Sequence, residues 1–569
     1  MILQALTRLY EDLENQKKIP RPGWSKANIS YALCLDENGG LEYVVPLLTE
    51  VPVGRKVQLR PMTMELPAEV KRTVDISPNF LWDNSSYLLG IDEKGKPERS
   101  RDCFRAAGRL HHRLLDGVNT LAAKAILAYF DTWDPGCAQG HPALADCMQG
   151  IMKGSNLVFR VGGSNAQDDP AIRAAWDAKQ AETQGKMQQC LVTGQQDVPA
   201  PVHPSIKGVR GAQSSGAALV SFNADAFCSY GKEQSLNAPV GKHAACAYTA
   251  ALNYLLSDRV YTVGDTTVVC WAEGAEPQYN LFARLSIFGG SAPEGLSDGD
   301  LRSAIGLLAR GLPCRELKLD PNRPFYILGL APNAARLSVR FFCRNSFGGL
   351  MKNVNEHQTR LKIDGSRYEP MPLWALLLET VNKNTKDPSP VLSGAVARAI
   401  FQGTTYPAAL LEAVMLRIRA ERDITPGRAA ILKAYYLKNS NPLCPKEVLT
   451  VSLNESSTNI PYTLGRLFAI YEEIQEQANP GINATIKDKY FNSASATPAI
   501  IFPILDNLCQ KHLRKLDTGL CIYHDRRIAA LKDVLGECYP TRLSLPEQGS
   551  FNLGYYHQKQ SRNTKKEEK

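Results

Sequence analysis

The pattern of apolar residues changes once along this chain, near residue 370, and no other feature constrains the fold as strongly. Before that point, short apolar runs are separated by turn residues, as strands are, with a few helical stretches between them. After it, apolar residues recur with a helical period, which is typical of amphipathic helices. We therefore expect an α+β fold, with a multidomain mixed α/β N-terminal body and an all-α C-terminal helical bundle.

Before residue 370, the predicted strands are residues 29–35, 41–48, 217–223, 266–273, 325–331 and 336–342. Residues 242–258 are predicted to form a helix. The last strand alternates polar and apolar residues, which predicts a half-buried strand with a basic face. Its apolar row is Leu337, Val339 and Phe341, and its basic row is Arg336, Arg340 and the following Arg344. This basic row is suited to binding phosphates. The alternative interpretation is a solvated basic face without a ligand.

After residue 370, the predicted helices are residues 406–422, 462–478, 497–513 and 526–538. Their apolar stripes and short connections predict a helical bundle. At roughly 150 residues per domain, the 569 residues predict three or four domains. The predicted segments are 1–130 (an α+β domain with a candidate recognition loop), 131–370 (a central body with a Gly-rich loop and a basic strand), 371–450 (a helical connector), 451–560 (the bundle) and 561–569 (a disordered tail).

Charge is distributed unevenly along the chain. Residues 301–450 carry a balance of +11, whereas residues 1–300 sum to −4 and residues 451–569 to +2. A basic middle third suggests a polyanionic partner, and a solubilising surface is the alternative. No window is long and apolar enough to cross a membrane, and the acidic start does not resemble a secretory signal. The 14 cysteines contain no CxxC pair, so we expect free thiols in a cytoplasmic protein.

Motifs for catalysis are scarce. The sequence has no GxxxxGK[ST] loop, no GxGxxG after a strand and no HExxH. The remaining candidates are a zinc cluster of Cys137, His141 and Cys147, a Lys207–Ser214 dyad and a His524–Asp525 pair, and each lacks the further residues its chemistry needs. We therefore predict no catalytic residue, no metal and no cofactor.

Two segments contain residues suited to DNA contacts. The first comprises Lys71, Arg72, Asn79 and Asn84, whose cations bind phosphate and whose amides hydrogen-bond base edges. Here the alternative is that Phe80 and Trp82 are core residues and the polar groups cap turns. In the second segment, glycines 208, 211 and 216 permit close backbone approach, and an ordinary Gly-rich loop is the alternative. Its predicted contacts are Lys207, Arg210, Gln213, Ser214, Ser215 and Asn223.

Long strings in a fixed order carry a family resemblance. They are VKRT (70–73) with PNFLWDNSSYLLG (78–90), CLVTG (190–194), IKGVRGAQSSGAALVSFNADAFCSYGKEQSLNAPV (206–240), FYILGLAPNAARLSVRFF (325–342), YTLGRLFAIYEEIQ (462–475), NATIKDKYFNSASATPA (483–499) and EQGSFNLGYYHQ (547–558). These strings closely resemble the large-subunit family of type I-C CRISPR interference (Cascade) complexes.

The resemblance implies a DNA-binding subunit that recognises a protospacer-adjacent motif (PAM) in double-stranded target DNA, promotes R-loop formation and contacts the displaced strand. The segment within residues 1–130 is then the candidate PAM-recognition loop, and residues 451–560 resemble the family's small subunit. Implied partners are the guide RNA complex, the backbone and guide-processing subunits, the helicase-nuclease and separately made C-terminal small-subunit fragments, with no membrane. The competing hypotheses are a metal-dependent nuclease using His524 and Asp525, and a purely architectural subunit.

Overall fold

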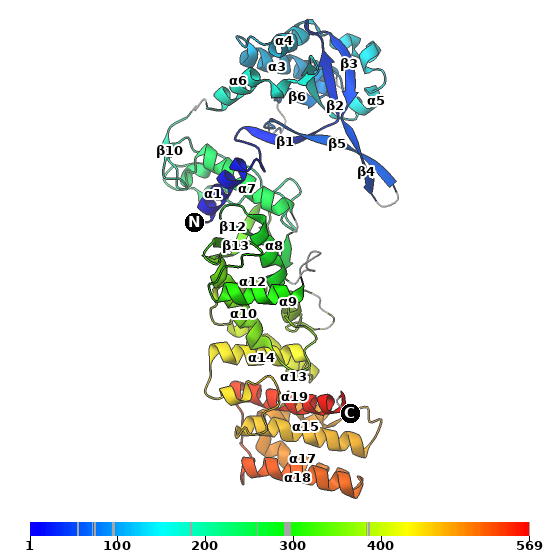
Figure 1. Cartoon of the computed structure of the whole chain (residues 1–569), viewed down its shortest axis with the longest axis vertical. Coiled ribbons are helices and arrows are strands. Elements are labelled where there is room, and N and C mark those ends of the chain that lie inside the picture. Colours follow the sequence, from blue (N-terminus) through cyan, green and yellow to red (C-terminus); the bar gives the residue numbers. More distant parts are fainter. Residues whose placement is uncertain are drawn as a thin grey trace. The chain divides into compact units, whose positions relative to one another are not determined.

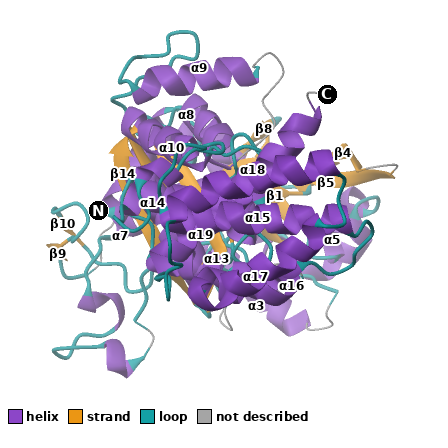
Figure 2. Cartoon of the chain, turned by 90° about the horizontal axis from the view of Figure 1, so that it is seen from below, coloured by secondary structure: helices purple, strands orange, loops and turns teal. Residues whose placement is uncertain are grey.

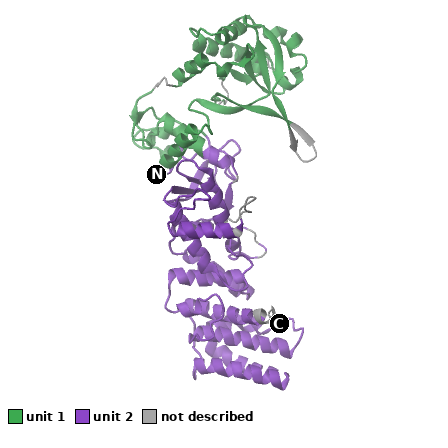
Figure 3. Cartoon of the chain, viewed as in Figure 1, with its two compact units in different colours: residues 1, 3–204, 222–251 green, residues 2, 205–221, 252–569 purple. Residues whose placement is uncertain are grey.

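The structure is a computed structural model that describes residues 1–53, 56–70, 72, 76–93, 97–181, 185–222, 224–258, 260–288, 297–382, 384 and 387–567. The chain forms two compact units (Figure 3). Unit 1 contains residues 1, 3–204 and 222–251, and unit 2 contains residues 2, 205–221 and 252–569. The units confirm an α+β fold, but they divide the chain differently from the five predicted segments.

A small mixed sheet forms the centre of unit 1 (Figure 1). Strand β2 (Tyr31–Leu35) pairs antiparallel with β3 (Leu41–Pro46) and parallel with β7 (Asn156–Val161). On the other edge of β7 lie β6 (Trp82–Asn84) and β8 (Ser164–Asn165). All five residues of β2 are buried, because apolar clusters cover both of its faces.

Helices and a long β-ribbon complete unit 1. The helices are α1 (Ile2–Asn15), α2 (Ser85–Leu88), α3 (Pro97–Leu115), α4 (Leu121–Thr132), α5 (Met148–Met152) and α6 (Pro170–Ala181). The ribbon has strand order β1 (Trp24–Ile29), β5 (Lys56–Pro67), β4 (Leu48–Val53), and β9 (Gln188–Gln189) pairs with β10 (Gln196–Asp197). Helix α7 (Lys242–Ser257) confirms the helix predicted at residues 242–258 and contributes residues to both units.

A buried histidine connects α3 to the segment that precedes β6. The Leu81 backbone N–H donates to His111 Nε2 at 3.0 Å, and His111 Nδ1 therefore carries the proton and donates to the Ala107 carbonyl at 2.8 Å. Both ring nitrogens are satisfied only in the neutral tautomer. Burial accordingly lowers the pKa of His111 to about 4.

We expect unit 1 to lose stability as the pH falls below neutrality. The unfolded chain protonates His111 near its ordinary pKa of 6.5, whereas the folded chain resists protonation until about pH 4. The stabilising contribution is therefore complete above pH 6.5 and should fall by about 2 kcal/mol between pH 7 and pH 5. Urea unfolding of wild type and His111→Gln at both pH values measures this difference.

The neighbouring His112 is the control for this prediction. Its side chain is partly exposed, and its contacts with Asp131 and Asp116 raise its pKa against the lowering effect of burial. The His112→Gln variant should therefore keep the acid sensitivity of wild type. An equal pH dependence in wild type and His111→Gln would contradict the role of His111.

Unit 2 begins with a four-stranded antiparallel sheet. Its order is β11 (Tyr261–Val263), β12 (Thr266–Ala272), β13 (Pro324–Asn333) and β14 (Arg336–Ser346), which confirms the last three predicted strands. The strand predicted at residues 217–223 is wrong, because among the described residues 217–222 only Ala217 and Ala218 make bridges, both isolated.

A β-bulge corrects the predicted faces of β14. The register with β13 shifts between Gly329 and Leu330, so that Leu330 pairs with Val339 and Gly329 pairs with Phe341. Arg340 is the extra residue of the bulge. Because of it, the side chains after Arg340 point to the opposite face of the sheet from the one that strict alternation predicts. Phe341 consequently faces the core, whereas Val339, predicted to be apolar and buried, is 41 % exposed.

Helices make up the rest of unit 2 (Figures 1 and 2). They are α8 (Pro277–Ala283), α9 (Asp298–Ala309), α10 (Phe347–Leu361), α11 (Leu373–Leu378), α12 (Pro390–Gln402), α13 (Ala408–Glu421), α14 (Pro426–Asn439), α15 (Ile460–Ala478), α16 (Ile486–Ala496), α17 (Pro498–Leu513), α18 (Thr518–Leu535) and α19 (Leu545–Glu567). Among the described residues after Ser346 there is no strand, as the change near residue 370 predicts. One apolar cluster extends from Val263 to Tyr556, so the sheet, the connector and the bundle share a continuous core.

The predicted disordered tail is wrong for residues 561–567, which continue α19 as far as Glu567. Arg562 explains the extension, because its guanidinium pairs with Glu476 at 2.8 Å and with Glu473 at 3.7 Å on α15. An ion pair with a neighbouring helix therefore replaces the apolar contacts that the tail lacks. Residues 568 and 569 lie outside the described residues.

Candidate nucleic-acid interface

The second predicted contact segment forms a closed loop, residues 206–217, which we call the glycine loop. At its base, the Ile206 N–H donates to the Ala217 carbonyl and the Ala217 N–H donates to the Ile206 carbonyl, both at 2.9 Å. Within the loop, the Gly216 N–H donates to the Gln213 carbonyl at 2.9 Å. These backbone bonds give the loop a defined conformation.

Side chains and backbone of three elements anchor the glycine loop. On α7, Asn253 Oδ1 accepts from the Lys207 N–H at 2.9 Å. On β12, Thr267 Oγ1 accepts from the Arg210 N–H at 3.2 Å. Directly after the loop, the Ala218 N–H donates to the Ala335 carbonyl, and the Leu337 N–H of β14 donates to the Ala218 carbonyl, both at 3.0 Å. The loop is thus fixed to the edge of the sheet.

The three glycines have a structural role that differs from the predicted one. Their φ angles are +90° at Gly208, +79° at Gly211 and +95° at Gly216, in the left-handed region that favours glycine. An added Cβ would lie 3.2 Å from Leu256, 3.3 Å from Pro332 and 2.7 Å from Ser205, respectively. These glycines are therefore required for close approach within the protein itself, and close approach to a ligand stays a prediction.

Polar side chains of the glycine loop face the solvent. Lys207, Arg210, Gln213, Ser214 and Ser215 are all exposed. In the described part of the chain, none of these five side chains has a hydrogen-bond or ion-pair partner, so the Lys207–Ser214 dyad is not formed. Fixed backbone and unengaged donors are what a phosphate- or base-binding loop requires. The sixth predicted contact of this segment, Asn223, lies outside the described residues.

The first predicted contact segment is organised differently, because its polar groups bind one another. Asp83 is 1 % exposed and accepts from both terminal nitrogens of Arg72, and Arg72 also lies over the Tyr87 ring at 4.1 Å. The Asp83 carboxylate further accepts from the Asn79 N–H at 2.9 Å and the Asn84 N–H at 2.8 Å. Burial raises the pKa of the Asp83 carboxyl, and the Arg72 ion pair and these N–H donors oppose that rise.

The remaining side chains of this segment are also engaged. Asn79 is 2 % exposed and its Oδ1 accepts from the Val70 N–H at 2.9 Å. Asn84 caps α2, accepting from the Ser86 N–H at 3.0 Å. Phe80 and Trp82 are core residues. The structure thus favours the alternative in which these polar groups cap turns, and Lys71 lies outside the described residues.

The three arginines of β14 do not form one row. Arg340 pairs with Asp265 at 2.8 Å, whereas Arg344 is exposed. Arg336 lies beside the glycine loop, because its residue forms a parallel bridge with Ala218. The backbone of Arg336 therefore lies next to the end of the glycine loop, whereas Arg340 is held by an ion pair.

Comparison with known families supports the resemblance found in the sequence. A family model described as CRISPR-associated protein (Cas_Csd1) matches residues 6–563, which include most of both units. The chain belongs to the Cas_Csd1 family. No curated protein matches it. The glycine loop is therefore a feature of a CRISPR-associated protein.

The His524–Asp525 pair of this Cas_Csd1 protein is not arranged as a catalytic pair. His524 is fully buried in the middle of α18, not at the surface or a helix start, whereas Asp525 is exposed. His524 Nε2 donates to Gln477 Oε1 at 2.8 Å, and burial lowers the pKa of the imidazole. The two side chains therefore do not converge on one site.

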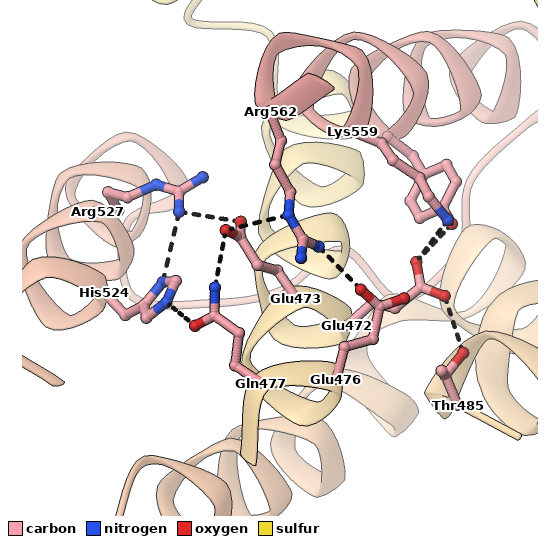
Figure 4. A network of polar contacts seen from close by, with 10 residues as sticks. Glu472, Glu473, Glu476, Gln477, Thr485, His524, Arg527, Lys559 and Arg562 are labelled. Carbon is pink, nitrogen blue, oxygen red and sulfur yellow. Dashed lines mark hydrogen bonds and ion pairs between the residues drawn. The ribbon is translucent and has the colours of Figure 1, made fainter. Parts of the chain in front are cut away.

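A polar network surrounds His524 (Figure 4). It joins Glu472, Glu473, Glu476 and Gln477 of α15 to Thr485, to His524 and Arg527 of α18 and to Lys559 and Arg562 of α19. Arg527 pairs with Glu473 at 3.0 Å, and Lys559 lies 3.5 Å from Glu472. Every carboxylate has a cationic partner, so the network stabilises the packing of three helices. Sequence spacing did not reveal it, because its members come from four separate segments.

The candidate zinc residues Cys137, His141 and Cys147 are not grouped as a metal site in the described part of this Cas_Csd1 chain. Cys137 is exposed, and its thiol donates a hydrogen bond to Asp134 Oδ2 at 3.5 Å. His141 Nδ1 accepts from the Ala143 N–H at 3.3 Å. Among the described residues, no group of three or more His, Cys, Asp or Glu side chains is placed to hold a metal ion. None of the described helices has the length and apolar character that crossing a membrane requires.

Much of the positive charge in residues 301–450 is used within the fold. Arg323 pairs with Glu276 at 2.7 Å, and the buried Arg428 pairs with Glu421 at 2.7 Å. Together with Arg340, these arginines hold elements of the Cas_Csd1 chain in place. Residue type and charge balance alone therefore do not identify the cations that are available to a ligand, and Lys207 and Arg210 lie outside that basic segment.

Proposed function

We propose that this Cas_Csd1 protein is the non-catalytic large subunit of a type I-C CRISPR RNA-guided surveillance complex. In this role it recognises the PAM in double-stranded target DNA, promotes R-loop formation, contacts the displaced strand and supports recruitment of the helicase-nuclease. The observation that carries the proposal is the glycine loop, which presents five exposed polar side chains on an anchored backbone. Membership of the Cas_Csd1 family supports the CRISPR context.

The physical argument rests on pre-organisation. Lys207 and Arg210 supply positive charge for phosphates, and the serine hydroxyls and the Gln213 amide supply hydrogen-bonding groups for base edges or the sugar-phosphate backbone. Because the loop backbone is already anchored, binding DNA need not order it, and less conformational entropy is lost. An isolated basic patch on a mobile segment would lack this advantage.

Charge removal at the glycine loop should weaken DNA binding and reduce its salt dependence. For the Lys207→Gln/Arg210→Gln double variant in the assembled complex, the slope of log K against log salt should become less negative by about 0.9 for each lost phosphate contact. Filter binding to target duplex across a salt series measures the slope. An unchanged slope with unchanged affinity would count against the glycine loop as a DNA contact.

Two exposed cations outside the loop provide the control. Arg315 and Lys446 lie on other surface segments of unit 2. The Arg315→Gln/Lys446→Gln variant removes the same charge and should leave the slope nearer to that of wild type. Mutating the PAM in the target DNA tests the alternative of a purely architectural subunit. That alternative predicts that the affinity of the complex for the target DNA stays unchanged.

A further inference from the structure

A solvent-exposed tyrosine marks a loop of unit 1. Tyr230 is 97 % exposed and lies in the segment of residues 224–237, which we call the tyrosine loop. Its φ is +56°, that of the following Gly231 is +65°, and the Lys232 N–H donates to the Ser229 carbonyl at 3.0 Å. Two successive positive φ angles closed by this bond define a type I′ turn with Tyr230 at its first central position.

Tyrosine is an unfavourable residue at this position. The left-handed region suits glycine and asparagine, and a bulky side chain is strained there. Packing does not compensate for the strain, since the ring is almost completely exposed to solvent. The tyrosine therefore contributes nothing to the fold that would explain its presence at the tip of the turn.

The tyrosine loop is held by one side chain. Asn237 Oδ1 accepts from the Ser229 N–H at 2.8 Å, and Asn237 Nδ2 donates to the carbonyls of Lys232 at 3.0 Å and Gln234 at 2.9 Å. These three bonds hold the two sides of the turn together. The ring of Tyr230 is thus presented from a defined backbone.

The surroundings of Tyr230 favour a flat aromatic ligand over a protein surface. Its nearest neighbours in the sequence, Ser229, Gly231, Lys232, Glu233 and Gln234, are all exposed and carry no apolar side chain, whereas Phe227 of the same loop is 41 % exposed. A tyrosine that anchors a protein interface is normally surrounded by contacts that exclude water. Stacking on a nucleobase needs only a free ring face, and Lys232 supplies a cation for the adjoining phosphate.

We propose that Tyr230 stacks on an unpaired base of single-stranded DNA. This inference rests on the proposed DNA-binding function and specifies a residue that engages single-stranded DNA. The glycine loop belongs to unit 2 and the tyrosine loop to unit 1. The two loops have different chemistry, because one offers hydrogen-bond donors and charge and the other offers an aromatic face.

The test uses the full-length chain and forked DNA with 2-aminopurine at each unpaired position in turn. The Tyr230→Asn variant removes the ring and keeps a residue that tolerates the left-handed turn. Wild type and Tyr230→Phe should quench the 2-aminopurine at one position. Tyr230→Asn should lose this quenching and bind the fork roughly 5- to 150-fold more weakly, while its binding to unforked duplex stays unchanged.

Equal quenching and fork affinity in Tyr230→Asn and wild type would overturn the inference. A variant that keeps both but no longer assembles with the other complex subunits would show that Tyr230 contacts protein instead. The Lys207→Gln/Arg210→Gln variant separates the two proposals, because it should weaken duplex binding and retain quenching at the fork. Loss of quenching in Tyr230→Asn together with normal salt dependence in the double variant would support Tyr230 and reject the glycine loop.

Discussion

Replacing Gly465 with alanine is expected to destabilise unit 2 by on the order of 3 kcal/mol or more. Gly465 lies where α15 crosses α19, and its added Cβ would be 2.0 Å from the Phe551 carbonyl oxygen and 2.7 Å from the Tyr555 backbone nitrogen. Both neighbours are backbone atoms, so no side-chain rotation can relieve the clash. Gly554 makes the reciprocal approach, with an added Cβ 2.1 Å from the Tyr462 carbonyl oxygen.

Separating the two helices would also break contacts that depend on their spacing. Buried Glu472 of α15 accepts from the Tyr555 hydroxyl of α19 at 2.6 Å, and Arg466 Nε donates to Gln558 at 3.1 Å. Urea unfolding of the full-length protein, followed by far-UV circular dichroism, measures the loss for Gly465→Ala. A change within about 0.5 kcal/mol of wild type would show that the helices do not pack at this distance.

A second helical glycine provides the matched control. Gly306 lies within α9, and an added Cβ there meets no described atom within 4 Å. Alanine has a higher helix propensity than glycine by about 1 kcal/mol, so Gly306→Ala should be neutral or slightly stabilising. If Gly465→Ala lowers the free energy of unfolding and Gly306→Ala raises it, the loss at Gly465 is due to the close packing of α15 against α19.

Removing the carboxylate of Asp83 is expected to cost unit 1 about 3–5 kcal/mol, because it leaves a partly buried Arg72 without its partner. Asp83 also accepts two backbone N–H groups, and Arg72 Nε donates to the Ser77 carbonyl at 2.6 Å. The Asp83→Ala variant therefore breaks the whole segment that precedes α2. Urea unfolding, monitored by tryptophan fluorescence, measures the effect.

An exposed ion pair in the same unit is the control. Asp102 lies 3.4 Å from Arg105, with side chains 56 % and 68 % exposed, so Asp102→Ala should change stability by less than about 1 kcal/mol. A small effect of Asp83→Ala would contradict the structural role of the pair. Arg72→Gln decides whether Arg72 also contacts DNA, since a purely structural arginine lowers stability and leaves the salt slope of the folded protein unchanged.

The elements with strong periodicity were predictable from the sequence, and those that depend on distant partners were not. The helices α7, α13, α15 and α17 and the strands β12, β13 and β14 appear where the pattern places them, whereas α18 begins at Thr518, well before the predicted start at residue 526. Helix α19 was not predicted, and the tail after residue 560 was expected to be disordered, because the end of this helix is held by ion pairs of Arg562 with α15. The bulge at Arg340 was missed because a one-residue register shift leaves no local signal.

The candidate site shows the same division. Lys207 and Arg72 were equally plausible DNA contacts by residue type. In the structure Lys207 is exposed without a described partner, whereas Arg72 is bound by Asp83 and Tyr87. Glycines 208, 211 and 216 were expected to permit close backbone approach, and the atoms that they approach in the structure belong to this chain. Tyr230 was not singled out, because exposure and backbone strain are properties of the fold.

By itself, the sequence determined the α+β class, the change from strands to helices near residue 370 and the resemblance to a CRISPR-associated family. These properties depend on local periodicity or on the order of long sequence motifs, and both can be read directly from the amino-acid sequence. Only the tertiary structure decided which charges are available, since a cation is free or engaged according to residues that folding brings beside it. For this reason the same residue types stabilise the fold around Asp83 and face the solvent on the glycine loop.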